Sequence, residues 1–480
     1  MGNTTRSLET ESTYEVLSEK DMQGIMDAVY ELLRDVGFRF DPDPRVLDLF
    51  SAAGCDVSSK GIVKISRELI ESALDSTGER PGVFDRNGDA VDTGAVAFAA
   101  GMTCVNVIDA ETGQRRPSTR EDLVTITRVA DALPDIDFIY PSCKIVDRSD
   151  VHGDIDEFAV LAAHTTKPIG WLSEFSKALE AAIEIGAAIR GGRDRLREKP
   201  YFSFDICPLP LYCSQKQIDQ LFVALENDIP TFSGSVTLGG ANAPITIAGS
   251  LVVGIATDMA MVVLAQLIKK GCYFDVGTEA SFMDPRTGGA GGFPEALLSE
   301  TARNQIYGKL GFSAGSAAGE GGSPRFDQVA AAAISSTMMH AFYSGARNTG
   351  YLGSIEHGLT YSLHALLFCH EIAGLIRRME RGIEVNADTL AMETAKEVGL
   401  SGNYLAEKHT AAHCRTELWL PRYFRSETTE EWERGGRRSL IDLIDEHLHE
   451  ILATHRPEPL PDHVSRQIDD ILVKYGVMEG

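Results

Sequence analysis

The middle of the chain alternates short apolar runs with helix-length amphipathic segments, and this rhythm restricts the fold more than any other feature. Segments such as KALEAAIEIGAAIRG and PEALLSETARNQIYGKLG separate the runs. The runs are DFIYPS (137–142), KPIGWLSE (167–174), PYFSFDICP (200–208), IPTFSGS (229–235), CYFDVGT (272–278), GFSAGSAA (311–318) and RNTGYLG (347–353). Seven units exceed what half of a Rossmann fold needs. They predict an α/β fold, a (β/α)8 TIM barrel whose remaining strand lies within 96–108.

Helical patterns flank this repeat on both sides. Near the N-terminus, apolar residues at spacings of three and four follow Ser18, a favoured helix cap, and residues 82–116 read as extended segments joined by turns. Near the other end, HRPEPLPDHV predicts a stiff link to a last helix. The expected domains are an N-terminal helical cap and β-hairpin region (1–95), a barrel catalytic domain (96–380) and a C-terminal helical extension (381–480).

Composition narrows the class of partner. The 480 residues include 45 Lys and Arg against 70 Asp and Glu, a net charge of −25. Such a surface repels nucleic acid and anionic membranes and attracts cations, although acidity alone also serves solubility. The polar N-terminus lacks a signal-peptide core, and no stretch gives about 20 uninterrupted apolar residues, so we expect a cytoplasmic protein. The eight cysteines form no C-x-x-C pair, which argues against a disulfide framework and a thiolate zinc site.

Two glycine clusters stand out, TGGAGGFP (287–294) and GSAAGEGG (315–322). Neither contains the lysine of a phosphate loop or the spacing of a dinucleotide turn. In a barrel both follow strands, at the carboxyl-end mouth where active sites are assembled, and glycine there lets the backbone approach a bulky planar ligand. Flexible loops without a ligand remain the alternative.

Two long stretches carry a family resemblance: GSPRFDQVAAAAISSTMMHAFYSGARNTGYLGSIEHGLTYS, and the region from HEIAGLIRRMERG to HTAAHCRTELWLPRYF and WERGGRRSL. With GQRRPSTREDLVTITRVADALPDID (113–137), they resemble the trimethylamine methyltransferase family, in particular the members without pyrrolysine that act on glycine betaine. The resemblance implies a (β/α)8 barrel that moves a methyl group from an amine to the Co(I) of a separate corrinoid protein docked over the mouth. It also implies a homo-oligomer and a corrinoid (cobalamin) carried by that partner, with no cofactor bound tightly in this chain.

The chemistry favours a quaternary amine. A quaternary nitrogen is already a good leaving group, whereas trimethylamine has a lone pair that must be masked, and this chain contains only standard residues. A quaternary ammonium donates no N–H hydrogen bond, so aromatic faces and carboxylates should recognise it. The alternatives are a barrel that binds a quaternary amine or a corrinoid protein without turnover, and a methyltransferase for a different methyl donor.

Candidate site residues are polar or aromatic and lie near the expected strand ends. As catalytic residues we predict Glu320, Glu356, His357 and His364. As substrate-binding residues we predict Tyr140, Trp171, Phe204, Asp205, Phe232, Glu279, Arg325, Arg347 and Tyr351, with Glu174 as a further strand-end carboxylate. Arg325 or Arg347 would hold a substrate carboxylate in a bidentate way. The aromatic residues could instead fill the barrel, and the histidines could be ordinary core residues.

Histidines also occur in two further sequence patterns. SLHALLFCHEI places His364 and Cys369 where the resembled family tends to carry carboxylates, which leaves the substrate open. HTAAHCRTELW places His409, His413 and Glu417 on one face of a helix, a spacing that can bind a metal. We interpret this trio as a structural polar network and expect no metal site.

Overall fold

Eight parallel strands form the centre of the computed structural model, which describes residues 14–101, 103–148, 150–291, 293–313, 315–400 and 402–479. They are β4 (Ala97–Ala100), β7 (Phe138–Ile139), β8 (Ile169–Trp171), β9 (Phe202–Ile206), β11 (Thr231–Ser233), β13 (Phe274–Val276), β16 (Gly315–Ser316) and β17 (Asn348–Leu352). Neighbours follow chain order, and β17 pairs with β4, so the sheet curls until its first and last strands meet. Each expected run contains one strand, and β4 lies within 96–108. The mixed α/β fold with a curled parallel sheet is confirmed.

The sheet has one seam, between β13 and β16. No backbone ladder joins these two strands within the described residues. Instead, the Arg303 guanidinium donates to the carbonyls of Thr278 and Gly315, and the backbone N–H of Ser313 donates to the Asp275 carboxylate at 3.1 Å. Side chains therefore connect the two edges.

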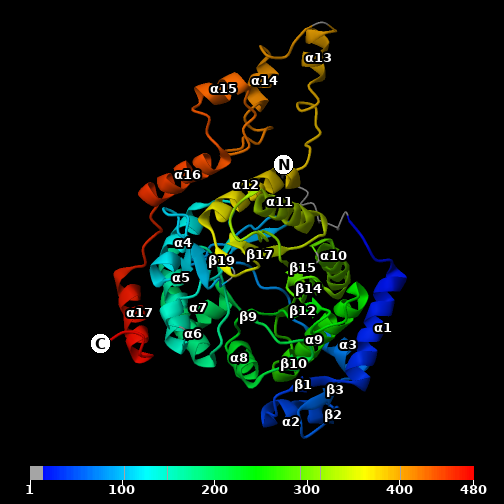
Figure 1. Ribbon diagram of the computed structural model, residues 1–480. Helices are drawn as coiled ribbons and strands as arrows, with labels where there is room; N and C mark the ends of the chain where they lie inside the picture. The colour runs from blue at the N-terminus through cyan, green and yellow to red at the C-terminus, as the bar shows by residue number, and fades with distance from the viewer. Residues whose placement is uncertain are drawn as a thin grey trace.

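Helices surround the sheet (Figure 1). They are α4 (Arg120–Ala132), α5 (Val151–His164), α6 (Ser176–Arg190), α7 (Arg193–Glu198), α8 (Gln215–Glu226), α9 (Ile247–Ile268), α10 (Phe293–Leu310), α11 (Gln328–Tyr343) and α12 (Leu363–Glu380), with a short 3₁₀ turn at Val146–Arg148. Side-chain caps begin several of them, for example the reciprocal Thr119–Asp122 pair at α4. Helix α9 is long and apolar enough to cross a membrane, but 78% of its most apolar window is buried inside the molecule. It is a core helix.

The N-terminal part packs against the outside of α9. It comprises α1 (Glu19–Asp35), β1 (Phe38–Phe40), α2 (Pro44–Ala52), β2 (Asp56–Val57), β3 (Ile62–Lys64) and α3 (Arg67–Ser76). As predicted, Ser18 caps α1, accepting from the Asp21 N–H. Strand β1 also pairs with β10 (Tyr212–Cys213), which joins this part to the segment after β9. The polar segment 1–13, in which no signal peptide was expected, lies outside the described residues, as does Gly292 of the first glycine cluster.

Two small sheets border the carboxyl ends of the central strands. One contains β18 (Ser354–Ile355), β19 (Thr360–Tyr361), β5 (Asn106–Ile108) and β6 (Arg115–Pro117). The other contains β12 (Val236–Gly239), β14 (Glu279–Met283) and β15 (Ala290–Gly291). Because each of these strands comes soon after a central strand, both sheets form the rim of the same end. We call this end the mouth.

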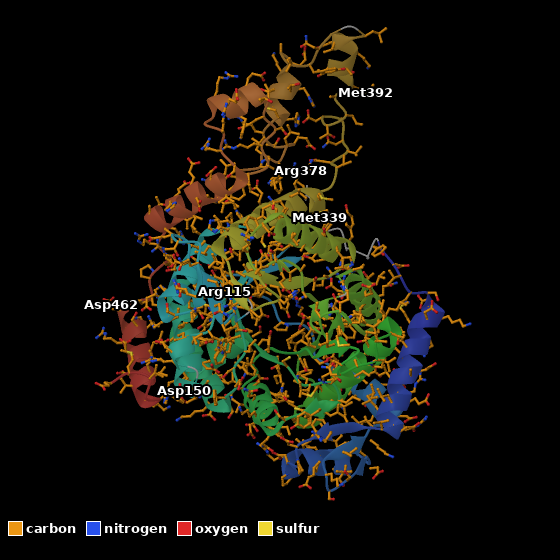
Figure 2. All side chains as sticks on the ribbon, in the orientation of Figure 1. Arg115, Asp150, Met339, Arg378, Met392 and Asp462 are labelled. Carbon is orange, nitrogen blue, oxygen red and sulfur yellow. The ribbon has the colours of Figure 1, made fainter. Side chains whose placement is uncertain are left out.

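The C-terminal part divides into an arm and two packed helices. Residues 381–438, the arm, carry α13 (Met392–Val398), α14 (Lys408–His413) and α15 (Thr429–Arg434), which stand clear of the helices around the sheet, as Met392 shows in Figure 2. Helix α16 (Leu440–Thr454) packs on α12, and α17 (Asp462–Lys474) packs on α6 after an extended link at 455–461. The expected last helix and its link are confirmed.

Candidate active site

A cavity of about 430 Å³ lies inside the curled sheet, with lining residues from all eight central strands. It extends from Pro168, Pro200 and Pro230 before the strands to Glu279 and Tyr351 at the mouth. Two glycines make room for aromatic rings in its wall. A Cβ at Gly170 would lie 2.1 Å from Cζ of Tyr140, and a Cβ at Gly277 would lie 2.6 Å from Cζ of Phe232.

Asp205 faces the cavity beside Tyr140. Alternation along β9 directs Ser203 and Asp205 inward. Burial raises the pKa of Asp205 to about 7, although the hydrogen bond from the Tyr140 hydroxyl favours the ionised form, and Asp275 adds to the rise. One carboxylate oxygen of Asp205, Oδ1, is buried and has no hydrogen-bond partner. The protein therefore supplies few groups that stabilise the ionised form of Asp205.

Glu279 and Tyr351 form a second pair at the mouth. The Tyr351 hydroxyl donates to Glu279 Oε2 at 2.7 Å. Burial raises the pKa of Glu279 despite this hydrogen bond, and burial together with the nearby carboxylate raises the pKa of Tyr351 well above its usual range. Both residues were predicted, and both line the cavity with Phe232.

Glu320 lies close to this pair, in the loop after β16. Burial and the charge of Glu279 raise its pKa to about 7, and its Oε1 has no hydrogen-bond partner. The Nδ1 atom of His357 is 3.8 Å from that oxygen. Glu320 and His357 therefore lie near each other at the rim, beyond hydrogen-bond distance.

Glu356 and His357 occupy an unusual backbone conformation, with φ values of 56° and 53°. Left-handed backbone costs a non-glycine residue about 1–2 kcal/mol, so neighbouring contacts must impose it. The N–H of Glu356 donates to the carbonyls of Gly321 and Ser323, both at 3.0 Å. Its carboxylate accepts from Arg115 Nε at 2.8 Å and from the Thr360 hydroxyl. Burial opposes ionisation of Glu356, but these two donors hold its pKa below the usual value.

Two predicted aromatic residues lie outside the cavity. Trp171 and Phe204 are fully buried on the outer face of the sheet, where Trp171 packs on Phe158 of α5 at 5.1 Å and on Phe204 at 5.8 Å between ring centroids. The prediction that they bind substrate is not supported by their position. Inward-facing and outward-facing residues alternate at a strand end. The sequence alone did not show which of them face the cavity.

The two predicted arginines also lie away from the cavity lining. Arg347 precedes β17, at the end opposite to the mouth, and is exposed. Arg325 is exposed in the loop before α11. Glu174, the further carboxylate, has a side chain 72% exposed and pairs with Lys216 at 3.3 Å. A substrate carboxylate in the cavity would not meet either arginine.

The histidine predictions need correction. Helix α12 begins at Leu363, so His364 lies in its first turn and His357 in the loop before it. The His364 ring is 2.7 Å from Asp445 of α16, a contact that fastens the C-terminal part rather than facing the cavity. Helix α14 ends at His413, so Glu417 is not aligned with His409 and His413, and it pairs instead with Arg378 at 2.8 Å.

Sequence reasoning missed three charged residues of the cavity, which are Asp275, Arg303 and Arg80. Asp275, in the middle of β13, is 6% exposed and accepts from the Tyr273 hydroxyl at 2.8 Å. Arg303, on α10, is 2% exposed and spans the seam. An acid inside the apolar run CYFDVGT was a usable signal for the first. The second gave none, because one arginine in an amphipathic helix is usually solvent-exposed.

Comparison with known proteins places the chain among methyltransferases. A family model described as trimethylamine methyltransferase matches residues 2–475. A trimethylamine methyltransferase of Desulfitobacterium hafniense is 29% identical, covering 96% of this chain and 94% of its own, and one of Methanosarcina barkeri is 27% identical over 95% and 94%. A glycine betaine methyltransferase of Desulfitobacterium hafniense is 23% identical over 96% and 97%. The solved monomethylamine methyltransferase of Methanosarcina barkeri aligns with a TM-score of 0.47 at 13% identity, over 97% of this chain and 96% of that one.

Proposed function

Because the chain belongs to the trimethylamine methyltransferase family, we propose that it moves an N-methyl group from a small quaternary ammonium compound to the Co(I) of a corrinoid protein. The corrinoid supplies the Co(I) nucleophile, and loss of a methyl group to it leaves a neutral tertiary amine. The task of this chain is then to hold the ammonium group in the cavity with one methyl directed to the mouth.

The acidic and aromatic lining of the cavity carries this proposal. Asp205 and Glu279 are buried carboxylates, and burial raises the pKa of each. The rings of Tyr140, Phe232 and Tyr351 line the same space. Carboxylates and aromatic faces attract a cation that has no N–H to donate. A quaternary ammonium would therefore stabilise the ionised carboxylates that the empty cavity disfavours.

The distribution of basic groups supports a substrate without a carboxylate. Within the described lining, the basic residues are Arg80 and Arg303. Arg303 already donates to Asn304 at 2.9 Å and to the carbonyls of the seam, and Arg80 lies beside Tyr273, before β13. A betaine carboxylate at the mouth would meet acidic groups, because Arg303 is already engaged and Arg80 lies near Tyr273, at the opposite end of the cavity. We therefore place a choline-like compound ahead of glycine betaine.

The rim has residues that fit a flat corrinoid ring. Gly322 is exposed, and a Cβ there would meet only the His357 ring, at 3.7 Å, so the loop presents little side chain. Gly319 serves the fold instead, because its φ is 94° and a Cβ would lie 2.7 Å from Leu352 Cδ1. In the proposal, Gly322, Glu320 and His357 would border the ring.

The proposal includes a finer architecture. The curled sheet is the wall of a (β/α)8 barrel whose last side is closed by Arg303, with the cap at 1–95, the barrel at 96–380 and the extension at 381–480. The protein acts in the cytoplasm as a homo-oligomer. Its partner is a cognate corrinoid protein rather than a nucleic acid or a membrane.

An absorbance assay tests the function. Purified protein is mixed with chemically reduced cob(I)alamin and, in turn, choline, tetramethylammonium, glycine betaine, carnitine and trimethylamine. We expect methylcobalamin to form with a carboxylate-free quaternary compound. Folded protein that forms none with any compound contradicts the proposal. Calorimetric binding without transfer would favour a non-catalytic binding barrel instead.

A further inference from the structure

The arm lacks the apolar core that normally holds a segment of its length in place. Between Ile376 and Leu443, the one buried residue that the structure describes is Tyr423. Helices α13, α14 and α15 contain no buried residue. Large side chains are exposed along it, among them Ile383 (86%), Leu400 (108%) and Leu405 (88%). Because small segments without a core usually need a metal, a disulfide or a partner to order them, another cross-link is called for.

Three potential metal ligands meet within the arm. The ligand atoms of Asp388, His409 and His413 all lie within 4.8 Å of one another. Asp388 Oδ2 is 3.2 Å from His413 Nε2, and the two imidazole rings lie 4.3 Å apart between centroids. A tetrahedral zinc with bonds of about 2.0–2.1 Å places its ligands about 3.3 Å apart. The first pair already has that separation.

Local structure fixes each ligand. The side-chain oxygen of Asn386 accepts from the N–H groups of Asp388 and Thr389, both at 2.9 Å, and this turn positions the carboxylate. His409 and His413 lie one turn apart on α14 and so share a face. The Thr410 hydroxyl donates to the Tyr404 carbonyl at 2.7 Å, which ties the start of α14 to the preceding loop. The ligands therefore come from two chain segments that no buried core holds together.

We propose that Asp388, His409 and His413 bind one Zn²⁺, with water as the fourth ligand. Two imidazole nitrogens and one carboxylate oxygen are a donor set that zinc accepts readily. The bound ion would cross-link the turn at 386–391 to α14 and so order the arm. The site lies outside the cavity, and the proposal does not depend on the methyl-transfer reaction.

Zinc titration of the untagged, chelator-treated full chain tests the site. Calorimetry should show one Zn²⁺ bound per chain, with a Kd at least 100-fold tighter than in His413→Ala. His449→Ala is the matched control. His449 is an exposed histidine on α16 and does not belong to the cluster of three ligands. It should bind zinc as the wild type does.

Hydrogen exchange supplies the second measurement. Adding Zn²⁺ should slow amide exchange at 386–413 in the wild type and in His449→Ala, but not in His413→Ala. The proposal is overturned if the wild type binds no Zn²⁺ at micromolar concentration. Equal affinity in wild type and His413→Ala, or binding that leaves exchange at 386–413 unchanged, also overturns it.

Discussion

The cavity and the arm each lack what the other has. The cavity is enclosed by eight strands and a large apolar core, yet Asp205 Oδ1 inside it and Glu320 Oε1 at its rim have no hydrogen-bond partner. In the arm and its junction with α12, charges are paired, for example Arg378 with Glu417 at 2.8 Å, but apolar side chains face outward. The first region is well packed, but the negative charge of its buried carboxylates is not balanced. The second is electrostatically balanced and short of a core.

This contrast indicates what a ligand would contribute in each region. A cation entering the cavity restores charge balance without having to shape the walls. An ion or a partner at the arm would instead supply order. Substitutions in the cavity should therefore affect activity, and substitutions in the arm should affect local stability.

The largest effect is expected for Asp205→Asn. The amide keeps the shape of the side chain but removes the charge that would face the substrate. We expect methyl transfer to fall about 1,000-fold, which is about 4 kcal/mol. The free energy of unfolding at pH 8 should rise by roughly 1–3 kcal/mol, because a buried charge is removed. The methylcobalamin assay and urea unfolding measure the two.

Asp56→Asn is the control, since Asp56 is exposed in β2, far along the chain from the cavity lining. It should change neither quantity. If Asp205→Asn transferred methyl groups at the wild-type rate, the charge of Asp205 would not be needed for activity.

Tyr423→Ala should release the arm. Tyr423 is 5% exposed, its N–H donates to Glu371 Oε1 at 2.6 Å, and its hydroxyl is 2.5 Å from the His447 ring. Truncating a buried aromatic residue costs about 3–5 kcal/mol. We expect protease cleavage within 381–438 to accelerate at least 100-fold while the sheet stays folded. Tyr404→Ala, at an exposed position, should cleave at the wild-type rate. Global unfolding of Tyr423→Ala would show that the arm is not a separate unit.

The pH dependence should have opposite signs for folding stability and for ligand affinity. Burial raises the pKa of Asp205, Asp258 and Glu320 to about 7 in the folded chain, against about 4 when unfolded. Between these values the folded state keeps protons that the unfolded chain has lost, so the contribution of these three groups to stability falls as pH rises from about 4 to about 7. Affinity for a quaternary ammonium should rise over the upper part of this range, because the cation favours the ionised carboxylates.

Urea unfolding from pH 4.5 to 7.5 and calorimetry with tetramethylammonium check both signs. Asp205→Asn should lose stability less steeply, by up to about 1.4 kcal/mol per pH unit. Parallel profiles for the two proteins would contradict the role of Asp205.

The smallest effect is expected for Arg115→Ala, at the rim (Figure 2). The Arg115–Glu356 pair spans 2.8 Å, but the Arg115 side chain is 44% exposed. Exposed ion pairs contribute less than about 1 kcal/mol, so thermal unfolding should change little. Arg286→Ala, which breaks the exposed pair with Asp284, is the matched control. If the free energy of unfolding fell by more than about 2 kcal/mol for Arg115→Ala alone, the rim would be part of the core.

The sequence predicted the strands well and the inward faces only in part. Alternating apolar runs located seven of the central strands, because period and length distinguish them from helices, and the eighth was expected within 96–108 only because a barrel needs it. Asp205 and Tyr351 were chosen correctly as cavity residues, whereas Phe204 was not, since adjacent positions on a strand face opposite ways. The contact of His364 with Asp445 joins residues 81 positions apart, and the contacts of Arg303 join α10 to the ends of two strands. No local pattern encodes such contacts, and only the folded chain places them.

The paired left-handed residues at the rim have a kinetic consequence. The N–H of Glu356 donates to the carbonyls of Gly321 and Ser323, which holds this turn in place, so the rim has its final shape before anything docks on it. A surface that is already ordered loses little chain entropy on association. A carrier that must arrive and depart in every catalytic cycle would then exchange at a speed set by diffusion and charge, without waiting for a loop to fold.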